Sequence, residues 1–433
     1  MFPDSYIVPA SRTSLARRCL TPTTDPAVGV GGFSFSNGVA FLAGLLTPFT
    51  ISLGGEMPVG EVVLLLAVGW AVLVFSVSHD WPGRLWSDPI FLMLMIGQAV
   101  ALAAYVVSDL YRGSEMHDLV RGWARMIFLA ADLAAVAYLL GCNARNFLAL
   151  LLGIQAGELL KVFSGGALFG DYWKFGYAIP VAVVVILLAG RGGRIAATLA
   201  SLGLGLINFI LDFRSLGMIC LIVAALTAVQ IFPRSWRIWI APLGLACGLV
   251  IGITVYAHTR SDREGDRTNR SNVERTAMMV AAVEAVEESP LLGHGSWFSR
   301  TKVIDNFMIL REEGARLAGV GGFAGANEDE EPVALHSQLL VTLAEGGLFG
   351  AAFFIPYILC LAWAAGHLVV GRDWTRDMPL RLFVICLAIF NAFMSPFSGA
   401  HRVHIALAAA LIILIREERD SLLPMDPDEE AFA

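Results

Sequence analysis

Charged residues are scarce in this chain: Asp, Glu, Lys and Arg make up 15% of the 433 residues, whereas 57% are hydrophobic. Soluble domains usually carry about a quarter charged residues, so this composition excludes an ordinary soluble globular protein. Three runs contain no charge at all, namely residues 62–75, 179–190 and 405–415. Apolar stretches that approach roughly 20 residues predict helices that cross a membrane. We therefore expect an all-α, polytopic membrane protein.

Other features are also missing, and each excludes a class of protein or site. No stripe of basic residues follows the chain, which argues against nucleic acid as a partner. None of the six cysteines lies in the longest polar segment, residues 258–335, so no disulfide framework holds it. No cysteine pair has metal-ligand spacing, and no unit of about 20–50 residues repeats. We expect no cofactor and no metal site.

Twelve apolar segments organise the chain. We expect a cytoplasmic tail (1–33), nine spans (34–257), a large loop (258–335), three spans (336–415) and a second cytoplasmic tail (416–433). The tenth span is long and can tilt or break at Gly346-Gly347 or Pro356. The predicted spans are 34–53, 58–78, 89–108, 122–142, 146–163, 175–190, 195–212, 215–232, 238–257, 336–366, 378–396 and 402–415.

Arginines in the short connections indicate how the chain is oriented. If the N-terminus is cytoplasmic, every inner connection carries at least one arginine, as the positive-inside rule requires. The same alternation places the 258–335 loop on the outer face, together with Arg214, Lys174 and the 395–401 turn. The inner arginines are Arg84, Arg145, Arg191, Arg194, Arg234, Arg237, Arg372, Arg376, Arg416 and Arg419.

The large outer loop has two parts. Residues 271–288 predict a helix, which Ser271 and Glu274 would open as a capping box and Pro290 would end. Residues 312–332 are rich in glycine and end in an acidic run, which is typical of a mobile surface loop.

Three basic side chains stand out on the predicted outer face: Arg214, Arg275 and His336. Arginine offers phosphate oxygens a rigid fork of donors, and a histidine with a near-neutral pKa can accept a proton from a hydroxyl. The N-terminus of the 271–288 helix would add unpaired N–H groups beside Arg275. Structural roles are equally open. Arg214 could pair with Asp212, Arg275 could be a solvated helix residue, and His336 could cap its helix.

Three further residues at the outer face are candidates for substrate binding. Lys174 follows Tyr172 and Trp173, aromatic residues that could form an interface belt or stack on a sugar. His401 and Arg402 open the last span and could contact an acceptor or a phosphate, or lie at the interface.

Other ionisable groups predict structural contacts. Glu345 comes nine residues after His336. A regular helix places the two on opposite faces. We therefore expect Glu345 to be a buried carboxylate that ties spans together. Four basic residues around the third outer connection fit phosphate contacts or a solvated amphipathic turn: Arg112, His117, Arg121 and Arg125.

These segments are similar to a known family. Residues 274–295 resemble the "R…W…NPLxGxG" element of the bacterial O-antigen ligase and O-antigen polymerase superfamily, and residues 336–350 resemble its "HN…L…ExGxxG" element. Arg214-Ser215 resembles its arginine at the outer end of a span. The twelve-span layout with a large loop between spans nine and ten matches too. Three residues depart from the pattern: Met279 replaces Trp, Ser337 replaces Asn, and His294 separates the two glycines.

The resemblance implies a membrane glycosyltransferase of the C type (GT-C) in a bacterial inner membrane. Its donor would be a glycan on an undecaprenyl-diphosphate carrier, and its active site would face the periplasm. His336 would act as general base, and Arg275 and Arg214 would hold the diphosphate, in an inverting reaction that needs no metal. A polymerase would use a second lipid-linked glycan as acceptor and a ligase lipid A–core. We favour the polymerase, because nothing in the sequence marks a lipid A–core acceptor.

Two other functions remain open from the sequence. A transporter of lipid-linked oligosaccharides would share the substrate, but we find no pair of related halves with broken helices. A non-catalytic partner of polysaccharide-export machinery could use the acidic residues 328–331 for docking.

Overall fold

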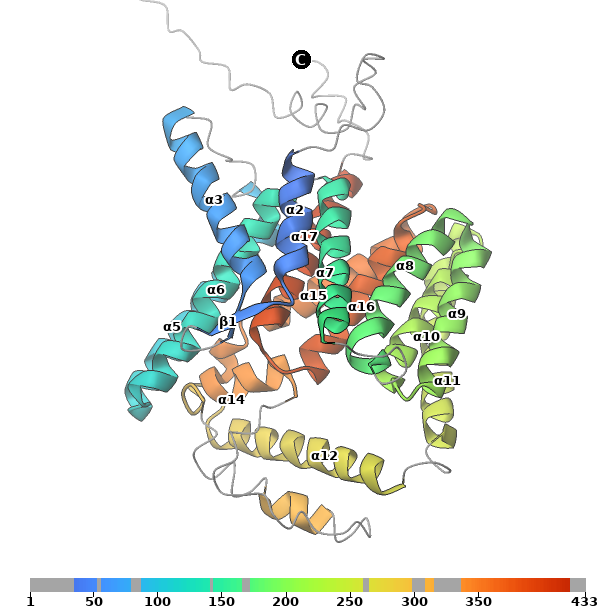
Figure 1. Ribbon diagram of the computed structural model, residues 1–433. Helices are drawn as coiled ribbons and strands as arrows, with labels where there is room; N and C mark the ends of the chain where they lie inside the picture. The colour runs from blue at the N-terminus through green and yellow to red at the C-terminus, as the bar shows by residue number, and fades with distance from the viewer. Residues whose placement is uncertain are drawn as a thin grey trace, which may run out of the picture.

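The structure is a computed structural model that describes residues 35–52, 56–78, 87–140, 143–165, 172–259, 265–297, 308–314 and 336–420. It is mostly helical, and most helices pack side by side in a bundle (Figure 1). The α-helices are α2 (Phe35–Leu46), α3 (Val59–Ser78), α5 (Pro89–Arg112), α6 (Met116–Leu140), α7 (Ala144–Ser164), α8 (Ala178–Arg191), α9 (Arg194–Ile210), α10 (Arg214–Val229), α11 (Arg234–Thr259), α12 (Gly265–Glu288), α14 (Gln338–Gly350), α15 (Phe354–Gly366), α16 (Met378–Met394) and α17 (Gly399–Asp420). Two π-helical turns, η1 (Trp173–Tyr177) and η3 (His367–Gly371), adjoin α8 and α15.

The predicted spans fall on these helices, and the protein is a multi-pass membrane protein. Within the described part of the chain, five helical segments are long and apolar enough to cross a membrane: α5, α6, α7, residues Arg234–Thr254 of α11, and the continuous α15–η3 segment. Several of the other predicted spans coincide with shorter apolar helices. The number of twelve crossings stays a prediction.

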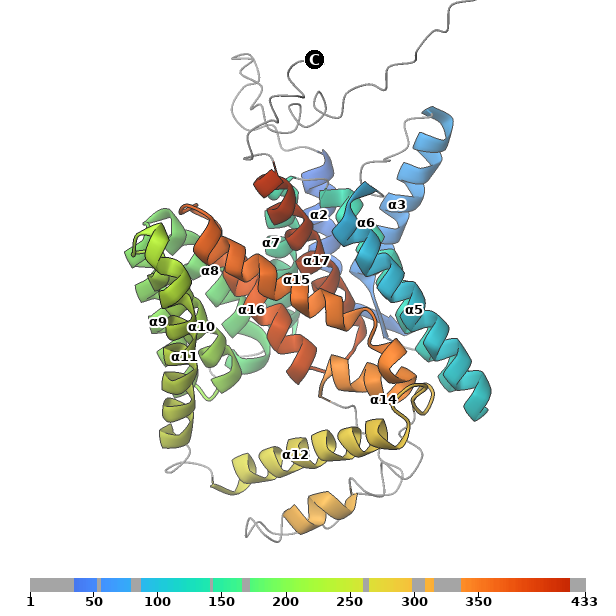
Figure 2. The same ribbon diagram turned by 180° about the vertical axis from the view of Figure 1, so that it is seen from behind.

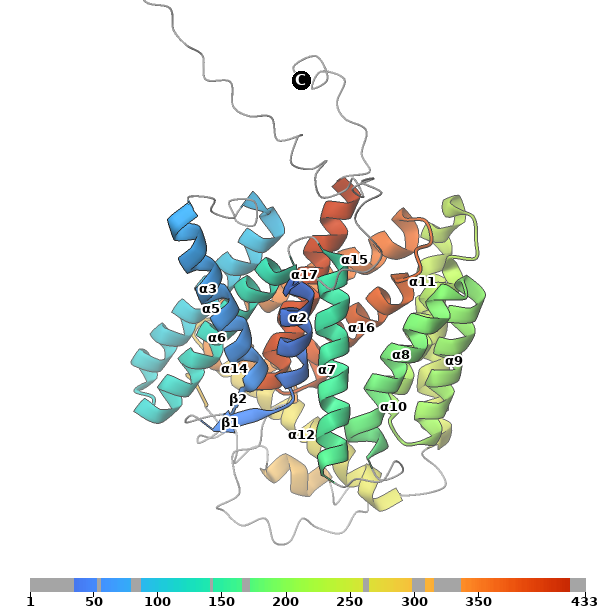
Figure 3. The same ribbon diagram turned by 45° about the horizontal axis from the view of Figure 1, so that its top comes forward.

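One element departs from the expected all-α fold. Strands β1 (Thr50–Ser52) and β2 (Glu56–Pro58) pair antiparallel in a connection that the sequence assigned partly to the first span. Helix α2 ends at Leu46, shortly before Pro48, whose ring cannot continue a helix. The hairpin lies at the same end of the bundle as α12 and α14 (Figure 3).

The predicted tenth span is broken, as the glycines allowed. Gly347 interrupts α14 with φ 64° and ψ −159°, a conformation that disfavours any side chain. The chain resumes as α15, and only the segment from Phe354 to Gly371 is long and apolar enough to span. Helix α14 lies between α12 and the lower parts of α5 and α15 (Figure 2).

Helix α12 begins earlier than expected and crosses the end of the bundle instead of running along it (Figure 1). It starts at Gly265, so Ser271 and Glu274 lie within the helix and the predicted capping box is wrong. The unpaired N–H groups of its N-terminus are therefore not next to Arg275. The helix ends at Glu288, just before Pro290, as predicted.

Several predicted inner arginines meet at the opposite end of the bundle. Arg237, at the start of α11, donates to the carbonyl of Arg372 at 2.8 Å. Arg372 and Arg381 both bind Glu418 near the end of α17. Arg416 binds Asp88, which caps α5. These contacts give the bundle one arginine-rich end, and α12 covers the other.

Candidate functional site

A turn that follows α12 is bonded to the broken helix α14. The break at Gly347 leaves the Ala344 carbonyl without its usual helical donor, and the N–H of His294 donates to it at 2.9 Å. Gly295 N–H donates to the Glu345 carbonyl at 2.9 Å, and Leu348 N–H donates to the Pro290 carbonyl at 2.8 Å. The two segments that resemble family motifs therefore lie against each other.

Glycine makes this close approach possible. A Cβ on Gly347 would lie 2.2 Å from the Leu291 carbonyl oxygen, and one on Gly293 would lie 2.4 Å from the Glu345 carbonyl oxygen. Both glycines have positive φ, of 64° and 68°. Any side chain would push the turn away from α14.

The carboxylate of Glu345 lies at the centre of this junction. It is buried and bonded to the Arg125 guanidinium of α6, to Tyr105 Oη of α5 at 2.6 Å and to the Trp297 N–H at 3.0 Å. It ties several elements together, as the sequence predicted. Arg125 is buried too, so neither a solvated turn nor a phosphate contact describes it.

Helix α5 holds the same turn through two more side chains. Asp109 is fully buried and accepts hydrogen bonds from Ser296 N–H and Oγ, at 2.5 and 2.8 Å, and from Trp123 Nε1 at 2.8 Å. Arg112 donates to the Gly293 carbonyl at 3.0 Å. Both residues fix the turn, so Arg112 is a structural residue here.

His336 precedes α14, and Arg275 lies on α12, which packs against α14. Although His336 is exposed, the packing around its imidazole lowers its pKa, and the positive charge of Arg275 lowers it further, against the smaller opposite effect of Glu274. Ser337, not His336, caps α14, because its Oγ accepts from the Leu340 N–H at 3.2 Å. The charge of Arg275 thus acts on His336, and a shared catalytic role for these two residues stays a prediction.

Arg214 begins α10 at the α12 end of the bundle, since α9 ends and α11 leads into α12 on that side (Figure 1). Its Nε lies 2.8 Å from Asp212 Oδ1, and its side chain is 15% exposed, against 57% for Asp212. Asp212 has a positive φ of 58°. The pairing expected from the sequence is therefore present, and it orients a guanidinium that still reaches solvent.

Lys174 lies in η1 and is half-buried. Its neighbour Trp173 is buried and donates from Nε1 to Asn208 Oδ1 of α9 at 3.0 Å. Trp173 therefore packs inside the bundle, and neither the interface belt nor sugar stacking describes it.

Arg402 lies in a buried cluster. Its Nε and Nη2 donate to both carboxylate oxygens of Glu61 at 2.8 and 2.7 Å, and Asp132 lies 4.0 Å away. This two-pronged pair occupies the face of the guanidinium that a phosphate would use, so the geometry favours a structural role. His401 Nδ1 lies 2.7 Å from Ser398 Oγ, and its ring lines a narrow cleft with Gln338 and Asn391.

We expect Arg402→Met to destabilise the protein by about 3–5 kcal/mol, because it leaves the Glu61 carboxylate buried and unpaired. Thermal unfolding in detergent measures this loss, and the double variant Arg402→Met/Glu61→Leu should recover much of it. An unchanged melting temperature with a raised KM for the donor would instead make Arg402 a substrate ligand.

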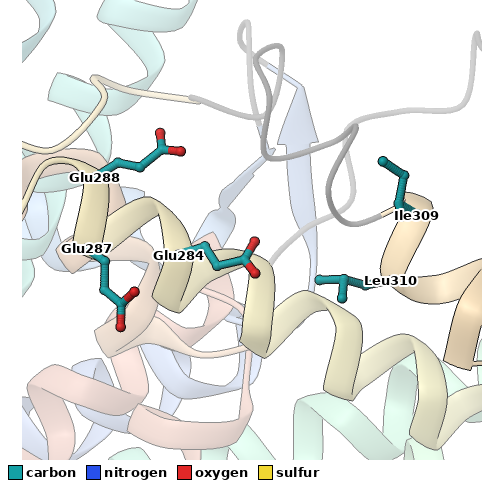
Figure 4. Close-up of a pocket in the computed structure, with 5 residues that line it drawn as sticks. All are labelled: Glu284, Glu287, Glu288, Ile309 and Leu310. Carbon is teal, nitrogen blue, oxygen red and sulfur yellow. The ribbon is translucent and has the colours of Figure 1, made fainter.

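An open groove lies between α12 and the short helix 308–314 (Figure 4). Glu284, Glu287 and Glu288 line one side, and Ile309 and Leu310 line the other. The acidic wall would repel a diphosphate, so this groove is not the donor site. Among the described residues, no group of three or more His, Cys, Asp or Glu side chains is placed to hold a metal ion.

Sequence reasoning missed Tyr105, Asp109 and Trp297, and it left the role of Arg125 open. The sequence did contain a signal for Asp109 and Arg125. Asp109 and Arg125 lie on or next to apolar spans, where an ionisable side chain needs a partner. Nothing local marked Tyr105 or Trp297.

The comparisons with known proteins agree with these motifs. Residues 176–355 match a family model described as O-antigen ligase. The match runs from η1 to the start of α15 and includes Arg214, Arg275, His336 and both segments that meet at the junction. A search of curated proteins finds no match to the chain.

Proposed function

We propose that this chain, whose residues 176–355 match the O-antigen ligase family model, is a metal-independent, inverting glycosyltransferase of the O-antigen ligase and polymerase superfamily. The family indicates a membrane enzyme that transfers glycans and uses lipid-linked polysaccharide substrates. Our proposal is narrower: the donor is a glycan on undecaprenyl diphosphate, and the acceptor is a sugar of a second lipid-linked glycan. The observation that carries it is the packing of α12, which holds Arg275, against α14, which follows His336, at the end of the bundle that α12 covers.

In the proposed reaction, a hydroxyl oxygen of the acceptor attacks the anomeric carbon of the donor sugar. The hydroxyl proton passes to the imidazole of His336 as the new C–O bond forms. The bond between the anomeric carbon and the diphosphate breaks on the opposite face, so the configuration inverts. The carrier diphosphate leaves as an anion and takes the electron pair of the broken bond.

The arginines would stabilise the charge that develops on the leaving diphosphate. Arg275 is exposed and presents a planar fork that matches two phosphate oxygens. Arg214, oriented by Asp212, would bind the other phosphate or the carrier-proximal oxygens. Fixed charges of this kind cost no reorganisation during the reaction and are often the largest single contribution to catalysis. Lys174 and His401 are weaker candidates for contacts to the glycan.

The proposed orientation has both termini in the cytoplasm and the reaction on the periplasmic face of a bacterial inner membrane. The arginine-rich end of the bundle supports it, because basic residues favour the cytoplasmic side. We favour polymerase over ligase as the reaction, since no residue indicates a lipid A–core acceptor. Export machinery remains a possible partner.

Purified protein in liposomes with a labelled lipid-linked oligosaccharide tests the proposal. Longer lipid-linked glycans mean a polymerase, and labelled lipid A–core, when that acceptor is supplied, means a ligase. Movement of the label across the bilayer without new glycosidic bonds would make the protein a transporter. If the assay shows neither new glycosidic bonds nor movement of the label, the protein is a non-catalytic partner and the proposal is overturned.

The rate should depend on pH through His336. The pKa of His336 is lowered from its ordinary value of 6.5 by the surrounding packing and by Arg275. A general base acts only when neutral, and kcat/KM reports the pKa of the free enzyme, so we expect kcat/KM to fall on the acidic side with a midpoint below 6.5. A rate profile of the reconstituted enzyme measures the midpoint. A midpoint above 6.5 would mean that His336 is not the base.

A further inference from the structure

The buried ion pair between Arg125 and Glu345 raises the question of what it does. Arg125 is 6% exposed and Glu345 2% exposed. Removing two charges from water is costly, and an apolar pair of similar volume is often as stable. Stability alone is therefore a weak reason for the pair, and its position is more informative.

Glu345 lies within α14, nine residues after His336 in the chain. Glu345 reaches α5 and α6 through Tyr105 and Arg125, which anchors α14 to the membrane bundle. His336 lies just before the first turn of the same helix. A change at the Glu345 anchor would therefore tilt the segment that carries His336.

Arg275 depends on the same anchor through α12. The turn that follows α12 includes Trp297, whose N–H donates to Glu345 Oε1 at 3.0 Å. The face of α12 formed by Ala277, Ala281 and Ala285 packs in one apolar cluster with Ala344, the neighbour of Glu345. The relative position of α12 and α14 is thus set at this carboxylate.

The backbone of Trp297 also indicates that its hydrogen bond to Glu345 constrains the structure. Its φ is 55°, which is unusual for a bulky residue. The guanidinium of Arg121 lies 4.4 Å from the centre of its ring and that of Arg125 lies 5.4 Å away. The hydrogen bond to Glu345 and these two cations hold a conformation that the local sequence disfavours.

We propose that Glu345 is a positioning residue that, clamped by Arg125 and Tyr105, sets the distance between Arg275 on α12 and His336 before α14. The proposal rests on the function proposed above, because it gives that distance a catalytic purpose. Glu345 does not touch the substrate.

The first experiment measures the His336 environment directly, without glycan transfer. Diethyl pyrocarbonate reacts with neutral imidazole, so its rate of reaction with His336 against pH, followed by peptide mass spectrometry, reports the pKa of that side chain. In Glu345→Gln, Arg125 loses its buried counter-charge and the junction loosens. Water then reaches the imidazole of His336 more easily, and Arg275 lies farther from it. Both changes weaken the effects that lower the pKa of His336, namely desolvation and repulsion by the Arg275 charge. We expect the midpoint to rise toward 6.5.

The second experiment measures transfer. A displacement of about 1 Å in a catalytic group can cost roughly 100-fold in rate, so we expect kcat of Glu345→Gln to fall by about that factor with KM for the donor little changed. Tyr105→Phe removes one hydrogen bond and keeps both charges. It should give a smaller change of the same kind, and it provides a folded variant if Glu345→Gln does not accumulate.

Glu418→Gln is the matched control, because Glu418 pairs with Arg381 at the opposite end of the bundle. It should lower thermal stability but leave the His336 midpoint and the shape of the rate profile unchanged. An unchanged His336 midpoint in both Glu345→Gln and Tyr105→Phe would overturn the proposal. Failure of the proposed function would be recognised by a different result: His336→Ala would retain full glycan transfer.

Discussion

Replacing His336 by alanine should reduce glycan transfer by about 10²–10⁴-fold, the range that a positioned general base contributes. The side chain lies before α14, is exposed, and has a pKa lowered by its packing and by Arg275. It is therefore mostly neutral at pH 7 and ready to accept a proton. Transfer of labelled glycan in liposomes, under single-turnover conditions, isolates this step from product release.

His117→Ala is the matched control for that variant. His117 is also exposed and lies at the start of α6, with its Nδ1 3.4 Å from Asp118. The His117→Ala variant should transfer glycan at the rate of the parent protein. Ser337, and not His336, caps α14, so His336→Ala should insert and unfold like the parent protein. Full transfer by His336→Ala would remove this residue from the mechanism.

Much of the helical framework followed from local pattern. Apolar runs of suitable length marked the spans, and Pro290 and Gly347 marked where α12 and α14 end or break. The start of α12 did not follow, because residues 265–270 are polar and show no apolar period. An apolar period is the signal by which a sequence marks a helix, so periodicity could not detect this turn of α12.

The partners of the charged groups could not be predicted, because they lie far apart in the chain. Arg125 and Glu345 are separated by 220 residues, and Arg402 and Glu61 by 341. From the sequence, Arg402 could contact an acceptor or a phosphate at the start of the last span, or lie at the interface. Its role changed once the structure placed Glu61 beside it. Local spacing shows that a buried charge needs a counter-charge, but only the fold shows which one.

Arg275 gives a sharper test of how the charge is used, since two properties can be separated at one position. Arg275→Met removes both the positive charge and the fork of donors, and we expect a loss of about 10²–10³-fold in kcat/KM. Arg275→Lys restores a positive charge but not the two-pronged geometry. It should remain well below the parent enzyme in transfer.

The pH profiles of these two variants should differ in a defined direction. Arg275 lowers the pKa of His336 by repulsion between like charges. Removing the charge in Arg275→Met should raise that pKa, so the acidic midpoint of kcat/KM moves to higher pH. Arg275→Lys keeps a cation nearby and should leave the midpoint close to that of the parent enzyme.

Arg145→Met serves as the control arginine, because Arg145 is exposed at the start of α7, where the sequence predicts the cytoplasmic side. It should change neither the rate nor the midpoint. If Arg275→Lys matched the parent enzyme in rate, a point charge would be sufficient and the two-pronged contact with the diphosphate would be wrong. If Arg275→Met kept the parent midpoint, the charge of Arg275 would not act on His336 in the working enzyme, and the proposed electrostatic link between the two residues would be wrong.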